Sequence, residues 1–420
     1  MLLTVILFLA VLSLLVFFHE LGHFVTAKKM GMKVDEFGFG FPPRAFGIMR
    51  LLGEERQLVN ETEEIIDIQP SPLTPLPGGE GEVIVDVVQD TVEVRPTKRW
   101  KFVWGASDQH EDETIYSINW IPLGGFVKIH GESGDLKNDP QSFASRPIWQ
   151  RFIVLVAGVA MNLFFAASLL SVGFAIGLPS IVDDSTPSSV KLTNEKVQIM
   201  SVVAANPAEK SGMEIGDELL SVNDQIFTSA EDARIYIKSQ EGQEVKFLLK
   251  RGDETLNFSV TAEELPTYNE KGVGVGLVKT ALISYPWYLA VVKGVESTFV
   301  FTWEVLKAFG NLLWNLIVHQ SVAVDLAGPV GIAVMTGEAA SMGILYLLQF
   351  AAILSINLAV VNILPFPALD GGRLLFLIVE KIRGRALNEK FEILVHNLGF
   401  ALLLLLVAFI TFRDIFKFVG

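Results

Sequence analysis

The chain has 420 residues, of which 50% are hydrophobic and 19% charged, and its formal net charge is −14. It is too apolar for an ordinary soluble protein and too charged for membrane spans alone, so we expect membrane helices together with at least one water-facing domain. The lack of cysteine excludes disulfides and cysteine-based metal sites, and no basic stripe suggests nucleic-acid binding.

The negative charge is concentrated in one segment. Residues 54–94 carry eleven acidic residues against one arginine, which is typical of a solvated insertion rather than of a protein that seeks basic partners. Within the insertion at 54–114, the proline-rich stretch Pro70–Pro77 and the alternating stretch Val83–Val88 predict a loop and a small sheet. The sequence assigns this insertion no function.

Four apolar runs are long enough to cross a bilayer, which takes about 20 residues. They are Leu2–Phe18, continuing to about Ala27, then Phe152–Leu178, Ile344–Phe366 and Leu398–Phe412, extending from about Phe391. A fifth stretch, Tyr285–Val318, is rich in Trp and Phe but is interrupted by charged residues. It predicts an amphipathic helix at the membrane interface, with a short span as the alternative.

Basic residues predict how the spans are oriented. They follow the first run, precede the second, and separate the third from the fourth. These residues are Lys28, Lys29, Arg44, Lys98, Arg99, Lys101, Arg146, Arg151, Lys381, Arg383, Arg385 and Lys390. The positive-inside rule then puts the N-terminus and residues 179–343 outside. Two basic residues near the C-terminus, Arg413 and Lys417, weakly oppose this orientation. A cleaved signal peptide is disfavoured for Met1–Phe18, which lacks a basic first segment.

The first run carries an H-E-x-x-H motif, formed by His19, Glu20 and His23. Residues four apart share a helix face, so both imidazoles reach one ion, and Glu20 lies where it can act as general base on the attacking water. Ionisable residues in an apolar run are costly unless they pair or bind something. The alternative is a pair of histidines hydrogen-bonded in a core, but packing alone does not explain three ionisable residues in an apolar helix.

A catalytic zinc site needs a third protein ligand. The other histidines are His110, His130, His319 and His396. Asp370 is the better candidate, although an aspartate before two glycines is often only a turn. Pro365 and Pro367 break the helix beside it and free backbone groups at membrane depth, where they need partners. Broken backbone beside a carboxylate at that depth predicts a site.

Taken together, these motifs resemble the site-2 protease family of intramembrane metalloproteases, in its bacterial form with a PDZ domain. Besides the H-E-x-x-H motif, four segments resemble recurrent family segments in the family's order and, with that motif, span residues 1–380. They are Ile121–Lys128, Gly158–Asn162, Gly328–Ala333 and the N-x-x-P-x-P-x-L-D-G pattern of Asn362–Gly371.

The resemblance implies that His19, His23 and Asp370 bind Zn²⁺ and that Glu20 is the catalytic base. It also implies that Tyr116–Gly131 is a β-hairpin dipping towards the active site. The residues of this segment also predict a strand, a Pro-Leu-Gly-Gly turn and a second strand. The edge of this hairpin could pair with an unwound substrate. A plain surface hairpin is the alternative.

Four further residues are expected to contact substrate: Gly124, Gly125, Asn162 and Asn362. The two glycines lie in the expected hairpin turn, and the two asparagines are polar residues in apolar runs. Hydrogen bonding between helices is an equal alternative for the asparagines. The resemblance further implies single-span membrane protein substrates, such as anti-sigma factors or signal-peptide remnants, and a location in the bacterial cytoplasmic membrane.

Residues 195–263 change to strand-like alternation with turns. The strands are expected at Gln198–Val203, Glu244–Lys250 and Thr255–Thr261 and a helix at Ala230–Ser239. The Gly-Asp-x-Leu-x-x-Val-Asn type signature beginning at Gly216 looks like one PDZ domain. Such a domain either captures an extended strand or carboxylate, or acts only as a size filter.

The predicted fold class is therefore an α-helical polytopic membrane protein of about four spans, with a membrane-associated β-hairpin and an inserted α+β PDZ domain. In chain order the expected parts are the first span (1–28), an inner region (29–148) with the acidic insertion (54–114) and hairpin (115–131), the second span (149–178), the PDZ domain and flanks (179–280), an interfacial region (281–342), the third span with the L-D-G motif (343–372), an inner loop (373–395) and the fourth span (396–418).

Two functions of other classes remain as alternatives. A proteolytically inactive scaffold presenting a PDZ domain would usually have lost one of the four motif residues, and all four are intact. A membrane metal transporter would also use intramembrane His and Asp. Transporters tend to have more spans and internal repeats, and the sequence has no evident repeat.

Overall fold

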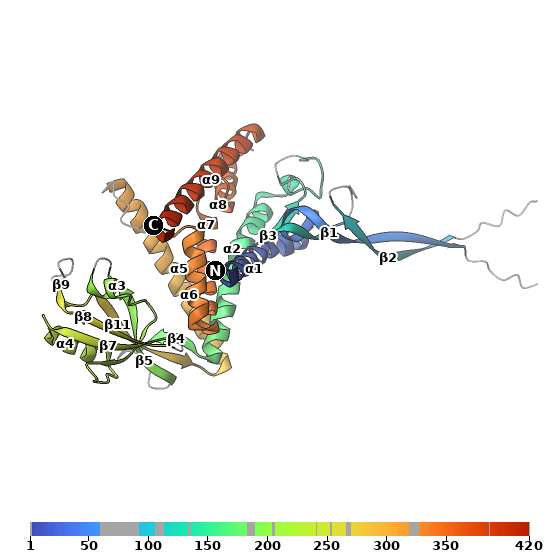
Figure 1. The fold of residues 1–420 in the computed structure, drawn as a ribbon. Helices are drawn as coiled ribbons and strands as arrows, with labels where there is room; N and C mark the ends of the chain where they lie inside the picture. Colours follow the sequence, from blue (N-terminus) through green and yellow to red (C-terminus); the bar gives the residue numbers. More distant parts are fainter. Residues whose placement is uncertain are drawn as a thin grey trace, which may run out of the picture.

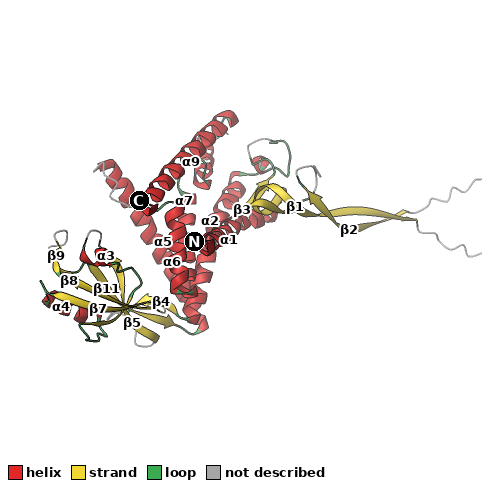
Figure 2. Cartoon of the chain, viewed as in Figure 1, coloured by secondary structure: helices red, strands yellow, loops and turns green. Residues whose placement is uncertain are grey.

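The computed structural model describes residues 2–58, 92–105, 113–132, 136–182, 190–203, 206–240, 242–252, 254–265, 270–318, 327–385 and 387–419. A bundle of helices lies between two β-rich parts, with strands β4 to β11 on one side and a ribbon of strands β1 to β3 on the other (Figure 1). Coloured by secondary structure, the bundle contains only helices, whereas the β-rich parts project from it (Figure 2).

Four helices in the described part are long and apolar enough to cross a membrane. They are α1 (Leu2–Lys29), α2 (Ile148–Ile176), α7 (Ile344–Ile363) and α9 (Glu389–Val419). Each covers one of the apolar runs of the sequence. Helix α9 packs least, since only 6% of its apolar window is buried inside the protein.

Three further helices complete the bundle: α5 (Trp287–Val318), α6 (Pro329–Met342) and α8 (Asp370–Arg383). Helix α5 covers the stretch expected at the membrane interface, and it packs against spans α2 and α7. Gly294 makes this possible, because a Cβ there would lie 2.8 Å from the carbonyl oxygen of Ala167 on α2. The amphipathic stretch is therefore part of the helical bundle.

The third span ends earlier than its expected boundary. Helix α7 stops at Ile363, because Pro365 lacks an amide hydrogen and disfavours a helical residue before it. The L-D-G motif consequently begins the separate helix α8, and most of the expected inner loop at 373–395 is helical. Short loops at both ends of α8 thus connect the third and fourth spans.

The three-stranded sheet has the strand order β2-β1-β3, with β1 at Val34–Leu58, β2 at Val92–Trp104 and β3 at Ile115–Ile129. Strand β2 lies within the predicted acidic insertion, whereas the strand expected at Val83–Val88 is outside the described residues. Strands β1 and β2 form a long two-stranded ribbon away from the bundle (Figure 1).

The segment expected as a hairpin folds differently. Both halves of β3 pair with β1 rather than with each other, so residues 36–39 lie between residues 115–118 and 125–128. The chain bends at Pro122-Leu123-Gly124, where Gly124 has a φ of +88°. Because β1 also bends, it fits between the two halves. The second half of β3 is left as an edge in the described part of the sheet.

The α+β domain contains a six-stranded sheet of order β4-β11-β5-β6-β7-β8. Its elements are β4 (Leu178–Ile181), β5 (Lys191–Val202), α3 (Pro207–Ser211), β6 (Glu218–Val222), α4 (Ala230–Ser239), β7 (Glu244–Arg251), β8 (Glu254–Thr261) and β11 (Val275–Ser284), with the small pair β9 (Glu263–Leu265) and β10 (Glu270–Gly272) beside it. The helix and strands predicted from the alternation all form, with β5 beginning earlier than expected. This is the expected PDZ domain, with its own core around Phe247.

Two other cores position the functional site. One joins the C-terminal end of α1 to the sheet, α2 and α8, through residues such as Ala27, Ile129 and Leu374, and includes the short 3-10 helix Phe143–Ser145. The other joins α2 and α7 around Ile356. The C-terminal end of α1, the sheet and the neighbouring parts of α2 and α8 therefore form one packed unit.

Candidate active site

Helix α1 carries the two motif histidines on one buried face. Their Nε2 atoms lie 3.2 Å apart, and the His23 Nδ1 lies 2.8 Å from the carbonyl oxygen of Val154 on α2. Neutral imidazole has one hydrogen, and a donor Nδ1 leaves the Nε2 lone pair of His23 free to bind a metal. Gly158 on α2 allows this approach, because a Cβ there would lie 2.4 Å from His23 Nε2.

Asp370 meets both histidines from the start of α8. Its Oδ2 lies 2.9 Å from His19 Nε2 and 3.3 Å from His23 Nε2. Gly371 permits the tight turn, since a Cβ there would lie 2.0 Å from the carbonyl oxygen of Leu364.

The spacing of these three ligand atoms fits zinc. Tetrahedral zinc with ligand bonds of about 2.0–2.1 Å holds its ligand atoms roughly 3.3 Å apart. The three separations here are 2.9, 3.2 and 3.3 Å. Among the described residues, only His19, His23 and Asp370 form a cluster of this kind. Two imidazoles and one carboxylate also match the donor set of catalytic zinc sites.

Both expected asparagines lie against His19. Asn162 is fully buried on α2, with its Nδ2 at 3.2 Å from His19 Nδ1, while its Oδ1 has no partner in the described part of the chain. Turning the amide over would let Oδ1 accept the Nδ1 hydrogen of His19, leaving the Nε2 lone pair for the metal. Asn362 approaches His19 Nε2 to 3.3 Å.

The two expected glycines bring the sheet onto α1. A Cβ on Gly124 would lie 2.6 Å from Val16, and one on Gly125 would lie 2.8 Å from Phe17 Cα and 3.4 Å from Glu20. The Ser13 hydroxyl donates to Pro122 O and accepts from Gly124 N. These contacts hold the bend of β3 directly beside the H-E-x-x-H helix.

Glu20 borders a cavity of about 260 Å³ at the junction of α1, β3 and α8. The cavity holds a predicted base, two predicted ligands and one predicted substrate contact. Its lining is Glu20, His23, Phe41, Gly125, Phe126, Val127, Glu132, Ala368, Leu369, Asp370, Arg373 and His396. The edge of β3 and the general-base candidate therefore face the same space.

Three charged or polar lining residues were missed by the sequence analysis as site residues: Glu132, Arg373 and His396. Arg373 lies three residues after Asp370, a helical spacing that could have indicated it. His396 accepts the amide hydrogen of Ala368 at 3.3 Å, in the turn that leads to Asp370, and Ala368 has a φ of +82°. That contact could not be read from the sequence.

The other histidines lie elsewhere. His130 bridges Asp35 and Asp139, at 3.2 and 3.0 Å, and is not part of the metal cluster. His110 and His319 are outside the described residues. Asp370 is thus the one third-ligand candidate that the described structure brings to the histidine pair.

The chain matches the model of peptidase family M50 over residues 7–55 and 102–406. The chain belongs to this family. It is 33% identical to the regulator of sigma-W protease RasP of Bacillus subtilis, over 98% of each chain. It is 31% identical to the zinc metalloprotease RasP of Geobacillus kaustophilus, over 99% of this chain and 98% of that one.

A solved PDZ domain, from the SdrC-like protein of Listeria monocytogenes, is 28% identical and covers 21% of this chain and 93% of its own, with a TM-score of 0.19. Family membership confirms the predicted site-2 protease type. The M50 chain is an integral membrane protein and an intramembrane zinc metalloprotease of regulated intramembrane proteolysis, which acts on membrane protein substrates.

Proposed function

We propose that His19, His23 and Asp370 hold the zinc ion and that Glu20 is the general base for peptide hydrolysis. The observation that carries this proposal is the convergence of three ligand atoms within 3.3 Å of one another, beside a cavity that Glu20 lines together with His23 and Asp370. When bound, zinc supplies a Lewis acid that polarises the scissile carbonyl and activates water.

The side chains around the ion divide the remaining work. Glu20 takes the proton of the attacking water and delivers it to the leaving amine, as a general base and then a general acid. Val154 O fixes the orientation of the His23 ring, and Asn162 that of the His19 ring, through contacts at 2.8 and 3.2 Å. Burial of both histidines keeps bulk water from competing for the ligand atoms.

Substrate binds as an added strand along the edge of β3. A helical substrate hides its peptide bonds in intrahelical hydrogen bonds, so it must unwind before cleavage. Residues 125–127 line the active-site cavity and lie at the sheet edge. Unpaired backbone groups on an edge strand bind an extended peptide, which restores the hydrogen bonds lost on unwinding.

The site lies at the inner end of the bundle, and the PDZ domain lies outside. Tyr346, near the start of α7, approaches Gln198 of the PDZ domain to 3.4 Å, while Asn362 at the other end contacts His19. These two positions are roughly 24 Å apart along a helix with a 1.5 Å rise per residue. The basic clusters orient the metal end inward, in a bacterial cytoplasmic membrane.

Its substrates are single-span membrane proteins, either anti-sigma-factor-like proteins already clipped outside or signal-peptide remnants. The relative from Bacillus subtilis is named regulator of sigma-W protease RasP, which supports a sigma-factor pathway for this chain. The PDZ domain, at the far end of the bundle from the metal, acts as a size filter: it refuses substrates with a bulky outer portion and leaves the chemistry unchanged.

Replacing the base tests the catalytic assignment. Glu20→Gln should abolish cleavage of a model single-span substrate in proteoliposomes while the purified protein keeps its zinc, because Glu20 is not a ligand. Cleavage by the Glu20→Gln protein at the wild-type rate would contradict the assignment of Glu20 as the general base. An inactive wild type with full zinc content would favour the scaffold alternative.

Deleting residues 195–263, with the ends rejoined by a flexible linker, tests the size filter. The deletion should permit cleavage of a full-length substrate and leave a trimmed substrate cut at a similar rate. If the PDZ groove instead recruits substrate, cleavage of the trimmed substrate slows and the full-length substrate is still refused.

Labelling of single introduced cysteines tests the orientation in the membrane. It should find residues 381–390 inside and residue 220 outside.

A further inference from the structure

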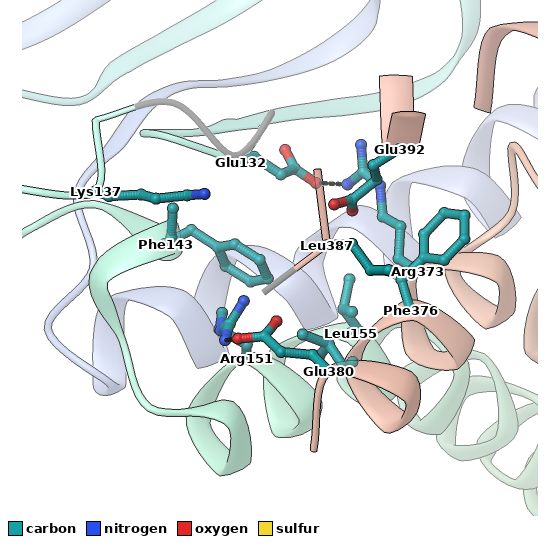
Figure 3. A pocket seen from close by; sticks show the side chains of 12 residues that line it. Glu132, Lys137, Phe143, Arg151, Leu155, Arg373, Phe376, Glu380, Leu387 and Glu392 are labelled. Atoms are coloured by element: carbon teal, nitrogen blue, oxygen red, sulfur yellow. Dashed lines mark hydrogen bonds and ion pairs between the residues drawn. The ribbon is translucent and has the colours of Figure 1, made fainter. Parts of the chain in front are cut away.

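A second cavity lies beside the active-site cavity and shares two of its residues. This cavity, of about 110 Å³, lies between the loop after β3, helix α2, helix α8 and the start of α9 (Figure 3). Glu132 and Arg373 line both cavities. These two residues therefore form the common wall.

Glu132 and Arg373 are joined by an ion pair. Arg373 Nη1 donates to Glu132 Oε1, and the two side chains are 31% and 24% exposed. Figure 3 shows the guanidinium between Glu132 and Glu392, which both turn their carboxylates towards it. Arg373 follows Asp370 by three residues on α8, and Glu132 follows the last residue of β3 by three. The pair thus connects the metal-ligand helix to the strand that we propose receives the substrate.

Each partner is held from behind by further contacts. On the side of Glu132, the His130 ring lies between Asp35 and Asp139, and His130 N donates to Lys33 O at 3.0 Å. On the side of Arg373, helix α8 is tied to α2 by its buried leucines. An ion pair between two anchored elements restrains their separation, in addition to the core in which Ile129 of β3 and Leu374 of α8 already pack.

We propose that Glu132 and Arg373 are positioning residues for peptide hydrolysis: their ion pair fixes the distance between the edge of β3 and the helix that begins with Asp370. This inference rests on the proposed function of the metal site. Pairing with the edge of β3 sets the position of the substrate strand, whereas residues of α1 and α8 hold the metal. A small change in their relative position moves the scissile carbonyl away from the ion, and a displacement of about 1 Å can cost roughly 100-fold in rate.

The chain offers a matched control in the same cavity. Arg151 Nη2 donates to Glu380 Oε1 at 2.7 Å, with side chains 14% and 19% exposed. This pair also ends on α8 and appears beside the first in Figure 3. It joins α8 to α2, and neither residue lines the active-site cavity. Losing it should affect stability more than catalysis.

A double-mutant cycle tests the proposal on purified full-length protein in proteoliposomes, with a model single-span substrate. The variants are Glu132→Gln, Arg373→Gln, the double variant and Arg373→Lys, with Glu380→Gln as control. Each glutamine variant should lower kcat about 10-fold or more, while KM and zinc content change little. The double variant should be no slower than the slower single variant, because one interaction is lost only once. Arg373→Lys should recover most of kcat, and Glu380→Gln should stay within about twofold of wild type.

Two results would overturn the proposal. One is a Glu132→Gln protein with wild-type kcat. The other is a double variant in which the losses multiply, which would mean that the two residues act independently. Failure of the proposed function looks different, because a dispensable Glu20 would contradict the metal-site assignment regardless of Glu132.

A covalent replacement gives a second readout that a loss of folding cannot imitate. The chain has no cysteine, so Glu132→Cys with Arg373→Cys places its only two thiols at these positions. Bridging them with a short bis-maleimide should raise kcat above that of the same protein treated with a monofunctional maleimide. Equal rates for the bridged and unbridged proteins would contradict a positioning role.

Discussion

The proposed metal site and the PDZ domain each enclose a carboxylate, and they use it in opposite ways. In the PDZ domain, Asp217 accepts hydrogen bonds from Glu214 N at 3.0 Å and from two nitrogens of Arg251 at 2.7 and 2.8 Å. At the metal site, Asp370 faces two imidazoles whose Nε2 atoms also face each other. Both oxygens of the Asp217 carboxylate accept hydrogen bonds from the protein, whereas the Asp370 carboxylate points to the place that the two Nε2 atoms also face.

This difference separates stabilising groups from functional ones. Polar groups that pair within their own domain offset the cost of burial. When both histidines carry their hydrogen on Nδ1, the two Nε2 lone pairs lie 3.2 Å apart beside the Asp370 carboxylate, and a cation between them stabilises this arrangement. The buried carboxylate of the PDZ domain is therefore paired within its own domain, whereas the proposed metal site gains its last partner when the ion binds.

The largest effect should come from removing a metal ligand. His23→Ala should lower the zinc content of purified protein to background and the cleavage rate by roughly 10³-fold or more, because the ion supplies the Lewis acid. Asp370→Ala should do the same by removing the anionic donor. Metal analysis and a cleavage assay check both variants. Normal zinc content in Asp370→Ala would move the third ligand elsewhere and break the comparison.

The next largest effect should come from the PDZ carboxylate. Asp217→Ala should destabilise that domain by about 2–3 kcal/mol, because it strands the Glu214 amide and the partly exposed Arg251 side chain. Hydrogen exchange over residues 191–284 of the full chain measures this loss. Zinc content should stay normal. The exposed pair of Arg234 with Glu231 supplies the control, since Glu231→Gln should change little.

Asn162 sharpens the comparison, because it is polar and buried but serves the ion indirectly. Asn162→Ala should weaken zinc binding about 10–100-fold by releasing the His19 ring. Titration of the protein with a zinc buffer measures the affinity. The matched control is Ser355→Ala. The Ser355 hydroxyl donates to the backbone carbonyl of Asn162 at 2.8 Å, so this variant removes a neighbouring contact between helices and leaves the Asn162 side chain in place. Equal zinc affinities in the two variants would leave Asn162 as an interhelical contact only.

The smallest effect concerns the three-stranded sheet and pH. Burial raises the pKa of Glu36, but the hydrogen bonds and the charge of Arg44 outweigh it, and the net pKa is lowered. Stability from this pair is therefore present above the ordinary carboxyl pKa and is lost as pH falls through the lowered value. Arg44→Lys should cost about 1 kcal/mol, because lysine cannot donate to both carboxylate oxygens.

Hydrogen exchange in β1 and β3 from pH 7 down to about pH 3, below the ordinary carboxyl pKa, checks this prediction. The Arg44→Lys sheet should begin to lose protection at a higher pH than the wild-type sheet. Identical pH profiles would mean that the pair at 2.6 Å contributes nothing to the sheet.

The sequence predicts the parts of the site that are local or chemically constrained. His19, Glu20 and His23 lie within one turn of helix, and Asp370 follows a proline-broken segment, so each carries its own signal. The spacing of Arg373 from Asp370 is a weak signal for Arg373 alone, but its contact with Glu132 carries none, because it joins residues 241 positions apart. The path of β3 was also hidden, since alternation predicts strands but not which strand they pair with.

The exposed edge of β3 has a consequence for selectivity. Backbone amides and carbonyls are the same in every peptide, so the main-chain hydrogen bonds of an added strand supply affinity without depending on the substrate's sequence. Cleavage rates should therefore follow how readily a transmembrane segment gives up its helix at the point that reaches the metal. Two substrates of unrelated sequence would compete equally if their helices unwind equally, and a single alanine-to-glycine change in a substrate could matter more than replacing its flanking residues.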